Sequence, residues 1–437
     1  MESVATPRAS VPKVVVAATL GSVMEYFDFF ASITAAALVW PSVFFPAGNP
    51  VTALALSLST YGLAFLVRPV GAIIFGHLGD TRGRKSTLVW TLSTMAMGTL
   101  GIGLLPGFAT VGAAAPVLLV LFRLLQGIGL GGEWGSASTW LAEFAAASRW
   151  RTFWTSWIQG SAGYGMLLAS FTFTVVASFT SHQYLLDFGW RVVYFIGVLI
   201  LGVGAVIRYR LQESPMFTRL QEEKRTERSP VTTVFRENWR KIILLAFAAT
   251  FVITLGEIED VPFSLIYTVK LGFPFAFATG VSTLASLFSL PIPILAAIVA
   301  SRYVRKKKWM LALGLAITMA VAFPFFMLIS TKQPALIVLA HLLWQAGMGV
   351  GGCVVPALIT EQFATRYRNS GAGLSYQIGA GIIPGMFATF VVPSIIAFAH
   401  GPLGAWPYIA ATTIAMGAVC LAAVLSIKEP DSVELAA

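Results

Sequence analysis

Charged residues are scarce in this 437-residue sequence, where Asp, Glu, Lys and Arg together make up 11%. An average soluble protein carries about 25%. Hydrophobic residues make up 57%, and the mean hydropathy is +0.79. So few charges cannot cover the surfaces of the roughly three soluble domains that this length would otherwise suggest. The composition therefore excludes a soluble multidomain protein and predicts a membrane protein.

Cysteine and histidine are also rare. Cys353 and Cys420 both lie in apolar stretches, which excludes a disulfide framework or a four-ligand metal site. The four histidines are scattered, without the i, i+4 spacing of metal-binding helices. We expect no metal and no cofactor, and we interpret the two cysteines as packing residues.

Long apolar runs take the place of the missing charges. Each is long enough, at about 20 residues, to cross a bilayer as a helix, and Gly, Pro and charged residues separate the runs. The first run is too long for the core of a signal peptide, so we interpret it as a retained span. The sequence predicts an all-α polytopic membrane protein with twelve spans, at residues 14–40, 52–79, 86–105, 115–144, 152–179, 189–209, 240–268, 275–300, 309–330, 335–362, 370–398 and 405–427.

Basic residues are unevenly shared between the two sides of the predicted bundle. Most of the 29 Lys and Arg residues fall in alternate loops and near the chain ends. This positive-inside bias predicts cytoplasmic termini and a multi-pass protein of the cell inner membrane. The net charge of +10 is expected to face anionic lipid headgroups rather than nucleic acid.

The predicted spans fall into two related sets of six. We expect six-helix bundles at 1–209 and 240–437, joined by a cytoplasmic linker at 210–239. Gly-Leu-Gly-Gly-Glu at 129–133 has a counterpart, Gly-Val-Gly-Gly-Cys, at 349–353. Chance similarity between Gly-rich spans is the alternative. Against it, an acid precedes two arginines downstream of both runs: Glu143, Arg149 and Arg151, then Glu361, Arg366 and Arg368. Two related halves around a midplane site are the usual architecture of secondary transporters.

A basic motif with three glycines lies between predicted spans 2 and 3. It reads Gly76-His-Leu-Gly79-Asp80-Thr-Arg82-Gly83-Arg84-Lys85 and follows Arg68-Pro69. Gly83 permits a tight turn, and the basic pair anchors the cytoplasmic face. Asp80 can accept hydrogen bonds from a helix start, which we predict to be Asn-Ser-Gly at 369–371, where span 11 begins. A generic basic loop would explain the positive charges but not the embedded acid.

This motif resembles the Gly-x-x-x-Asp-x-x-Gly-Arg-Lys signature of the major facilitator superfamily. The resemblance implies a cytoplasmic gate that holds that side shut while the outside is open. In the second half, Ser301 and Val304 stand where the acid and the third glycine of the motif are expected. The second half therefore lacks the negative charge that Asp80 gives to the gate of the first half. The gate residues that we predict are Gly76, Asp80, Gly83, Arg84, Lys85, Glu143, Arg149, Arg151, Glu361, Arg366 and Arg368.

Few ionisable residues lie inside the predicted spans, and each is a functional candidate because burying a charge in a membrane is costly. Glu25 and Asp28 share one face of span 1, and Arg123 and Glu133 lie on span 4. Since the two spans run in opposite directions, we expect Asp28 near the level of Arg123 and Glu25 near that of Glu133.

Longer runs carry a narrower resemblance, to the metabolite:proton symporter family of the same superfamily. They are Glu25-Tyr26-Phe27-Asp28, the stretch Arg123 to Glu133, Gly189-Trp190-Arg191 and Leu211-Gln212-Glu213-Ser214-Pro215. The resemblance covers nearly the whole chain and is thinnest over 240–330. It implies twelve helices in two bundles and the import of organic acids or zwitterions together with protons.

The intramembrane charges suggest how substrate and proton could be coupled. Our hypothesis is that an anionic substrate competes with Asp28 for Arg123, after which the released acid takes up a proton. The proton-coupling candidates are Glu25, Asp28 and Glu133. The substrate-binding candidates are Arg123, Tyr26, Gln126, Gln159, Tyr376 and Gln377. The alternatives are a static ion network that only orients helices, and ordinary hydrogen bonds between helices for each polar residue.

Two further features have simpler readings. The glycines between 127 and 132 favour close helix packing over a phosphate site. Glu257, Glu259 and Asp260 are interpreted as solvated acids at a helix end with Lys270 as partner, and an outer gate or second proton site is the alternative.

The sequence as a whole predicts a proton-driven symporter that imports a small organic anion, such as a mono-, di- or tricarboxylate, and acts as a monomer. The rivals are a sugar or zwitterionic osmolyte symporter, and a uniporter or exporter without proton coupling. An enzyme would need clustered catalytic groups or an appended soluble domain, which the sequence does not indicate.

Overall fold

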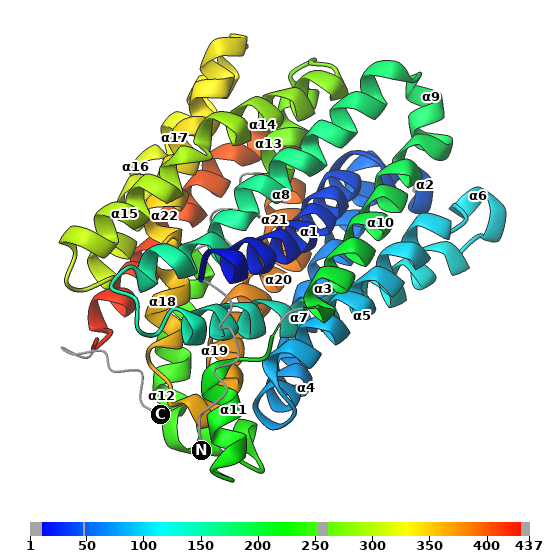
Figure 1. Ribbon diagram of the computed structural model, residues 1–437. Helices are drawn as coiled ribbons and strands as arrows, with labels where there is room; N and C mark the ends of the chain where they lie inside the picture. Colours follow the sequence, from blue (N-terminus) through cyan, green and yellow to red (C-terminus); the bar gives the residue numbers. More distant parts are fainter. Residues whose placement is uncertain (1–10, 47–48, 211, 252–260, 430–437) are drawn as a thin grey trace.

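The computed structural model describes residues 11–46, 49–210, 212–251 and 261–429 (Figure 1). Regular structure in these ranges is entirely helical, and eleven helical segments are long and apolar enough to cross a membrane. The all-α polytopic fold class is therefore confirmed.

Before the linker, the helices of the first half are α1 (Val11–Leu38), α2 (Trp40–Phe44), α3 (Pro50–Leu66), α4 (Arg68–Thr81), α5 (Arg84–Leu104), α6 (Phe108–Val111), α7 (Ala114–Phe144), α8 (Arg151–Phe179), α9 (His182–Tyr184), the π-helical turn η1 (Leu185–Gly189) and α10 (Trp190–Tyr209). After α11 (Pro215–Glu222), the helices of the second half are α12 (Pro230–Thr250), α13 (Val261–Lys270), α14 (Phe275–Ser289), α15 (Pro291–Tyr303), α16 (Lys308–Ser330), α17 (Pro334–Gly352), α18 (Val355–Thr360), η3 (Thr365–Tyr367), α19 (Arg368–Gln377), η4 (Ile378–Ile382), α20 (Ile383–Met386), η5 (Phe387–Val391), α21 (Val392–Phe398) and α22 (Pro402–Ser426).

Eleven of the predicted spans coincide with these segments to within a few residues at most ends. The seventh prediction, 240–268, runs through residues outside the described ranges, between α12 and α13. α12 begins inside the predicted linker and is kinked at Asn238, where the backbone leaves helical geometry with φ −132°. The linker is therefore largely helical, made of α11 and the first turns of α12.

The glycine run of α7 lies against the backbone of the second span. A Cβ atom at Gly127 would lie 2.1 Å from the Ala64 carbonyl oxygen, and one at Gly131 would lie 2.0 Å from that of Arg68. Any side chain at these positions would push the helices apart. The structure thus supports the packing interpretation of this run.

Two spans are broken at the same level, one in each half. α3 ends at Leu66 and α4 starts at Arg68, because Pro69 has no backbone N–H to continue the helix. In the second half the helix after α19 widens into the π-helical turn η4. A Cβ at Gly381, in η4, would lie 3.2 Å from the Arg68 Cβ atom. The two irregular segments therefore face each other across the contact between the halves.

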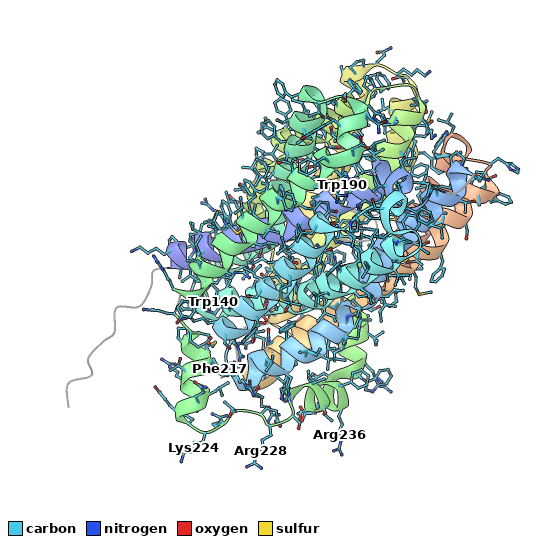
Figure 2. The ribbon with its side chains drawn as sticks, turned by 90° about the vertical axis from the view of Figure 1, so that its right-hand side faces the viewer. Trp140, Trp190, Phe217, Lys224, Arg228 and Arg236 are labelled. Atoms are coloured by element: carbon cyan, nitrogen blue, oxygen red, sulfur yellow. The ribbon has the colours of Figure 1, made fainter. Side chains whose placement is uncertain are left out.

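One end of the molecule is marked by the linker. α11 lies beyond the ends of the spans, close to the first turns of α12 (Figure 1). Lys224, Arg228 and Arg236 project from this end, and Trp190 lies towards the opposite one (Figure 2). We call these two ends the linker end and the far end.

Candidate functional site

A small cavity lies between the two halves, next to the paired helix breaks. Its volume is ≈ 10 Å³, room for about one water molecule. Residues of α1, α4 and α7 line it from the first half, and residues of α19 close it from the second. The lining residues are Glu25, Tyr26, Phe29, Arg68, Leu130, Tyr376 and Gln377.

Four of the predicted substrate-binding residues meet at this cavity or beside it. Gln159 Oε1 accepts hydrogen bonds from the Tyr376 hydroxyl (3.5 Å) and from Trp134 Nε1 (3.3 Å), and Gln159 Nε2 donates to the Tyr26 hydroxyl at 3.4 Å. The Tyr376 ring stacks on Trp134 with a centroid distance of 3.6 Å. Gln377 Nε2 donates to the Leu130 carbonyl at 3.2 Å. Uncharged donors and acceptors from both halves thus surround one space.

Arg68 is the cation of this cavity. Its side chain is 4% exposed, and its guanidinium lies 3.9 Å from the Phe65 ring centroid and 5.3 Å from that of Phe29. Nη1 donates to the Ala380 carbonyl oxygen in η4 at 3.4 Å. Arg68 therefore contacts both halves at the level of the helix breaks.

Arg123 and Asp28 lie in a second polar cluster, inside the first half. Asp28 accepts hydrogen bonds from Thr99 (2.7 Å) and from Gln126 Nε2 (2.8 Å). Arg123 Nη1 donates to Gln126 Oε1 at 2.5 Å, so one carboxamide bridges the guanidinium and the carboxylate. The two residues share a level, as we predicted, and both are 1% exposed. We call this set the Asp28 cluster.

The Asp28 cluster does not open into the central cavity. The Arg123 guanidinium lies near two aromatic rings, 4.9 Å from the centroid of Tyr61 and 5.8 Å from that of Trp40. Arg123 is absent from the cavity lining, whereas Glu25, one turn along α1 from Asp28, is part of it. The geometry therefore separates a charged cluster within the first half from a polar cavity between the halves.

Glu133 forms a buried ion pair. Its Oε1 lies 2.5 Å from Arg208 Nη2, and its Oε2 accepts from Arg208 Nη1 at 2.6 Å and from Thr91 at 2.8 Å. A Cβ at Gly21 would lie within 2.1 Å of the same guanidinium. Glu133 is thus tied to α10 by an ion pair and to α5 by a hydrogen bond, which is the geometry of the static alternative.

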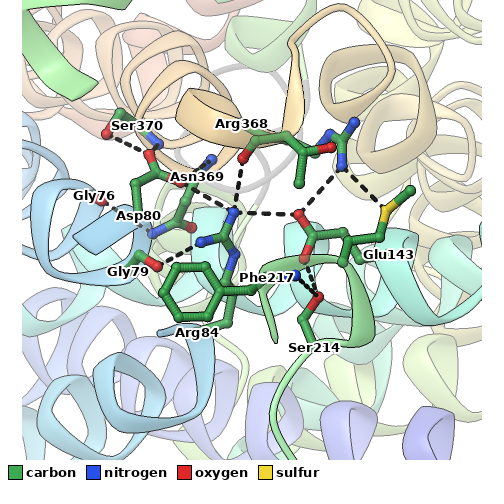
Figure 3. A network of polar contacts seen from close by, with 12 residues as sticks. Gly76, Gly79, Asp80, Arg84, Glu143, Ser214, Phe217, Arg368, Asn369 and Ser370 are labelled. Atoms are coloured by element: carbon green, nitrogen blue, oxygen red, sulfur yellow. Dashed lines mark hydrogen bonds and ion pairs between the residues drawn. The ribbon is translucent and has the colours of Figure 1, made fainter. Parts of the chain in front are cut away.

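At the linker end, Asp80 binds the start of α19 as the sequence predicts (Figure 3). Its carboxylate accepts hydrogen bonds from the backbone N–H groups of Asn369 (3.2 Å) and Ser370 (2.8 Å), and from the Ser370 hydroxyl (2.7 Å). The motif glycines allow this approach, since a Cβ at Gly79 would lie 1.9 Å from Asn369 Nδ2 and one at Gly76 would lie 3.1 Å from the Ser370 Cα atom.

Glu143, at the end of α7, joins the two halves beside this contact. It lies 3.3 Å from Arg84 and 3.2 Å from Arg368 of the second half, and all three side chains are fully buried. Arg84 also lies 3.1 Å from Asp80, and the Ser214 hydroxyl donates to the second oxygen of Glu143 (Figure 3). We call Asp80, Arg84, Glu143 and Arg368 the Glu143 cluster.

Glu213 caps the start of α5. It accepts hydrogen bonds from the backbone N–H groups of Arg84 (3.0 Å) and Lys85 (3.2 Å). Gly83, with φ of 115°, makes the turn, and a Cβ there would lie 2.2 Å from the Glu213 carboxylate. Burial raises the pKa of Glu213, while these backbone hydrogen bonds and the Arg84 charge oppose the shift.

A related cluster occupies the equivalent place in the second half. Glu361 lies 2.8 Å from Arg151 of the first half and 2.7 Å from Lys307. Glu429 accepts hydrogen bonds from the backbone N–H groups of Lys307 (2.9 Å) and Lys308 (2.8 Å), as Glu213 does at α5. We call Glu361, Arg151 and Lys307 the Glu361 cluster.

The remaining predicted gate residues lie outside both clusters. Lys85 Nζ lies 5.4 Å from the Tyr209 ring centroid. Arg149 is exposed beside Trp150, and Arg366 pairs with Glu237 at 3.5 Å on the surface. The acids at 257, 259 and 260 lie outside the described residues.

Sequence reasoning missed Arg68, Arg208 and Trp134. Arg68 was visible as a charge within a span next to a proline, a combination that marks a helix break. Arg208 falls at the end of the predicted span 189–209, where a cytoplasmic arginine is ordinary, yet the structure buries it against Glu133. No sequence signal singles out Trp134, whose role depends on its stacking with Tyr376.

Comparisons with known proteins agree with this architecture. Residues 18–389 match the sequence model of the Major Facilitator Superfamily. The chain is 36% identical over 389 residues to the inner membrane metabolite transport protein YhjE of Escherichia coli (strain K12), covering 87% of this chain and 88% of that protein. It is 31% identical over 387 residues to the shikimate transporter of the same organism, with 87% of each chain covered. A solved structure of the proton:xylose symporter XylE superposes with a TM-score of 0.73 at 17% identity, covering 94% of both chains.

Proposed function

This chain belongs to the major facilitator superfamily as a multi-pass membrane transporter rather than an enzyme, and we propose that it is a proton-coupled symporter that imports a small organic anion across the inner membrane by alternating access. The observation that carries the proposal is that the protein holds two separate buried sites with charged residues. One is the Asp28 cluster within the first half, and the other is the central cavity between the halves.

The Asp28 cluster provides a site for the proton. Asp28 is held by two donors, and the positive charge of Arg123 reaches it through Gln126. Protonation of Asp28 would turn an acceptor into a donor and force Gln126 or Thr99 to reorient. Because Arg123 donates to Gln126 and does not line the cavity, we assign it the role of balancing the negative charge of Asp28 at this proton site. Glu25 is the second proton candidate because it lines the cavity itself.

The central cavity provides the substrate site. Tyr26 of the first half and Tyr376 of the second both bond to Gln159, so a solute among them contacts both halves. At ≈ 10 Å³, the cavity must widen to hold an organic acid. Substrate binding therefore requires the two halves to move relative to each other, as alternating access demands.

The linker end provides the gate. The Glu143 and Glu361 clusters each link one half to the other through an ion pair. In our proposal these contacts close the cytoplasmic side while substrate enters from outside. Lys224, Arg228 and Arg236, which project from the linker end, support a cytoplasmic position for it (Figure 2).

Transport by the purified protein in liposomes tests the proposal. The panel consists of labelled shikimate, citrate, 2-oxoglutarate, proline, betaine and xylose, each with and without an inward proton gradient. We expect an acid to accumulate only with the gradient. Asp28→Asn should abolish gradient-driven accumulation and retain exchange of labelled for unlabelled substrate, because exchange needs no net proton movement.

The control is Glu237→Gln, which removes an exposed acid of the Arg366 pair and should transport like the wild type. Gradient-driven accumulation by Asp28→Asn would contradict the proton assignment. Accumulation of xylose or betaine in place of an acid would favour the second candidate, a sugar or zwitterion symporter. The uncharged lining by Tyr26, Tyr376 and Gln377 is compatible with that candidate.

A further inference from the structure

Among the residues that line the central cavity, Arg68 carries the positive charge and Glu25 the negative one. We infer that Arg68 binds the carboxylate of the transported anion. The inference rests on the proposed function, and it moves the anion-binding role from Arg123 to a residue on another span.

The position of each arginine separates the two roles. Arg123 lies in the middle of the continuous helix α7, with Gln126 as hydrogen-bond acceptor and two aromatic rings beside it. Arg68 lies at the break between α3 and α4 and lines the space that both halves share. A substrate in that space can reach Arg68 without disturbing the Asp28 cluster.

The surroundings of Arg68 suit a planar anion. Phe65 and Phe29 lie near its guanidinium, at 3.9 Å and 5.3 Å from the ring centroids. The guanidinium is planar with its N–H bonds in that plane, so a ring over its face leaves free the edge whose fork matches the two oxygens of a carboxylate. The aromatic contacts thus orient the side chain that would meet the substrate.

Arg68 is also placed to sense the movement of the halves. Its Nη1 donates to the Ala380 carbonyl in η4, and a Cβ atom added at Gly381 would lie 3.2 Å from the Cβ atom of Arg68. Broken helices that meet near the membrane midplane expose backbone groups and charges to a ligand, as in other transporter binding sites. When the halves separate on one side, the hydrogen bond between Arg68 and the Ala380 carbonyl would lengthen or break. An anion bound to Arg68 would therefore affect the energy of that movement.

Glu25 completes the charge balance of the cavity. When a monocarboxylate binds, one guanidinium faces two carboxylates, which leaves one negative charge in excess, and each further carboxylate of a di- or tricarboxylate adds one more. For a monocarboxylate, a single proton neutralises that excess. The arrangement therefore predicts that the substrate binds together with a proton.

The test measures how strongly the transporter prefers an acid over its neutral ester. The probe is whichever of shikimate, citrate and 2-oxoglutarate the wild type accumulates, paired with its methyl ester. Both are assayed by exchange across proteoliposomes without a proton gradient. We expect Arg68→Gln to lower the acid-over-ester preference by about 30-fold or more, because it removes the charged partner of a buried carboxylate.

Arg191→Gln is the matched control. Arg191 is a partly buried arginine of α10 that donates to the Gly103 and Leu105 carbonyls away from the cavity, so its loss should leave the preference unchanged. If Arg68→Gln does not fold, Arg68→Lys provides the test. Lysine keeps the charge without the fork, and the preference should fall by about tenfold.

Three results would overturn the inference. Wild-type preference in a folded Arg68 variant would refute it and leave the proposed function intact. Loss of preference in Arg123→Gln but not in Arg68→Gln would return the role to Arg123. Exchange of xylose or betaine, with none of the acids, by the wild type would overturn the inference and the proposed function together.

Discussion

The Glu143 and Glu361 clusters occupy equivalent places in the two halves, and both use an acid to reach an arginine of the other half. Glu143 meets Arg368, and Glu361 meets Arg151. In the Glu143 cluster the paired side chains are 0% exposed, whereas Arg151 is 13% and Glu361 4% exposed. The duplicated halves thus share the cross-half ion pair but differ in how deeply they bury it.

The difference arises at the helix that precedes each cluster. Asp80 accepts three hydrogen bonds from the start of α19, while Ser301, its counterpart, has a buried hydroxyl oxygen with no hydrogen-bond partner among the described residues. Gly83 turns with φ of 115°, whereas Val304 is extended. The acid of the first half therefore binds a helix start of the other half, as its sequence motif predicts, whereas Glu429 caps a helix of its own half.

The largest expected effect is a difference in stability between variants of the two acids, Glu143 and Glu361. Glu143→Gln leaves Arg84 and Arg368 buried without their shared carboxylate, which should cost about 3–5 kcal/mol in the free energy of unfolding. Glu361→Gln should cost about 1 kcal/mol, because its partners are partly exposed. Unfolding of both variants in detergent measures the difference, and equal losses would contradict the comparison.

The next effect concerns Asp80. Asp80→Asn weakens hydrogen bonds that gain strength from the charge of the carboxylate, and about 2 kcal/mol of the contact should be lost. Hydrogen–deuterium exchange at the backbone of residues 369 and 370 should therefore accelerate about 30-fold. Ser301→Ala serves as the control and should leave that exchange unchanged. If Asp80→Asn exchanged at the wild-type rate, Asp80 would not hold the start of α19.

Adding the missing charge should sharpen the comparison. Ser301 lies in the last turn of α15, which packs against α8. Ser301→Asp would place an acid where Asp80 stands in the first half, and we expect a gain of about 0.5–1 kcal/mol from an acid near the start of α8. Slower hydrogen exchange at residues 151–154 would confirm it. A loss of stability would show that the second half has no room for the charged contact.

The smallest effect is a pH dependence at the cap of α5. Burial raises the pKa of Glu213 in the folded protein, so the folded state holds a proton that the unfolded state has lost. Wild-type stability should therefore fall, relative to Glu213→Gln, as pH rises from the ordinary value for glutamate through the raised one. Unfolding of both proteins across that range measures the difference. A stability difference that rises with pH would contradict the raised pKa.

Much of the fold could be predicted because apolar runs and prolines are local signals. The contact of Asp80 with the start of α19 could be predicted for the same reason, since a capping motif and an unexplained acid stand at matching ends of two spans. The partners of Arg123, Glu133 and Glu361 could not. These partners depend on the side-chain rotamers and on which helices pack together, and neither is a local property of the sequence. The order of acid and arginines is the same in both halves, so it does not tell whether an ion pair forms within a half or across the halves.

The ion pair of Glu133 and Arg208 has a mechanical consequence. It ties α7 to α10 and, through Thr91, to α5, with no space for a side chain at Gly21 of α1. Four helices of the first half are thereby fastened into a unit that resists internal shear. In the alternating-access cycle that we propose, this unit would tilt against the other half as one body, without rearrangement of its interior.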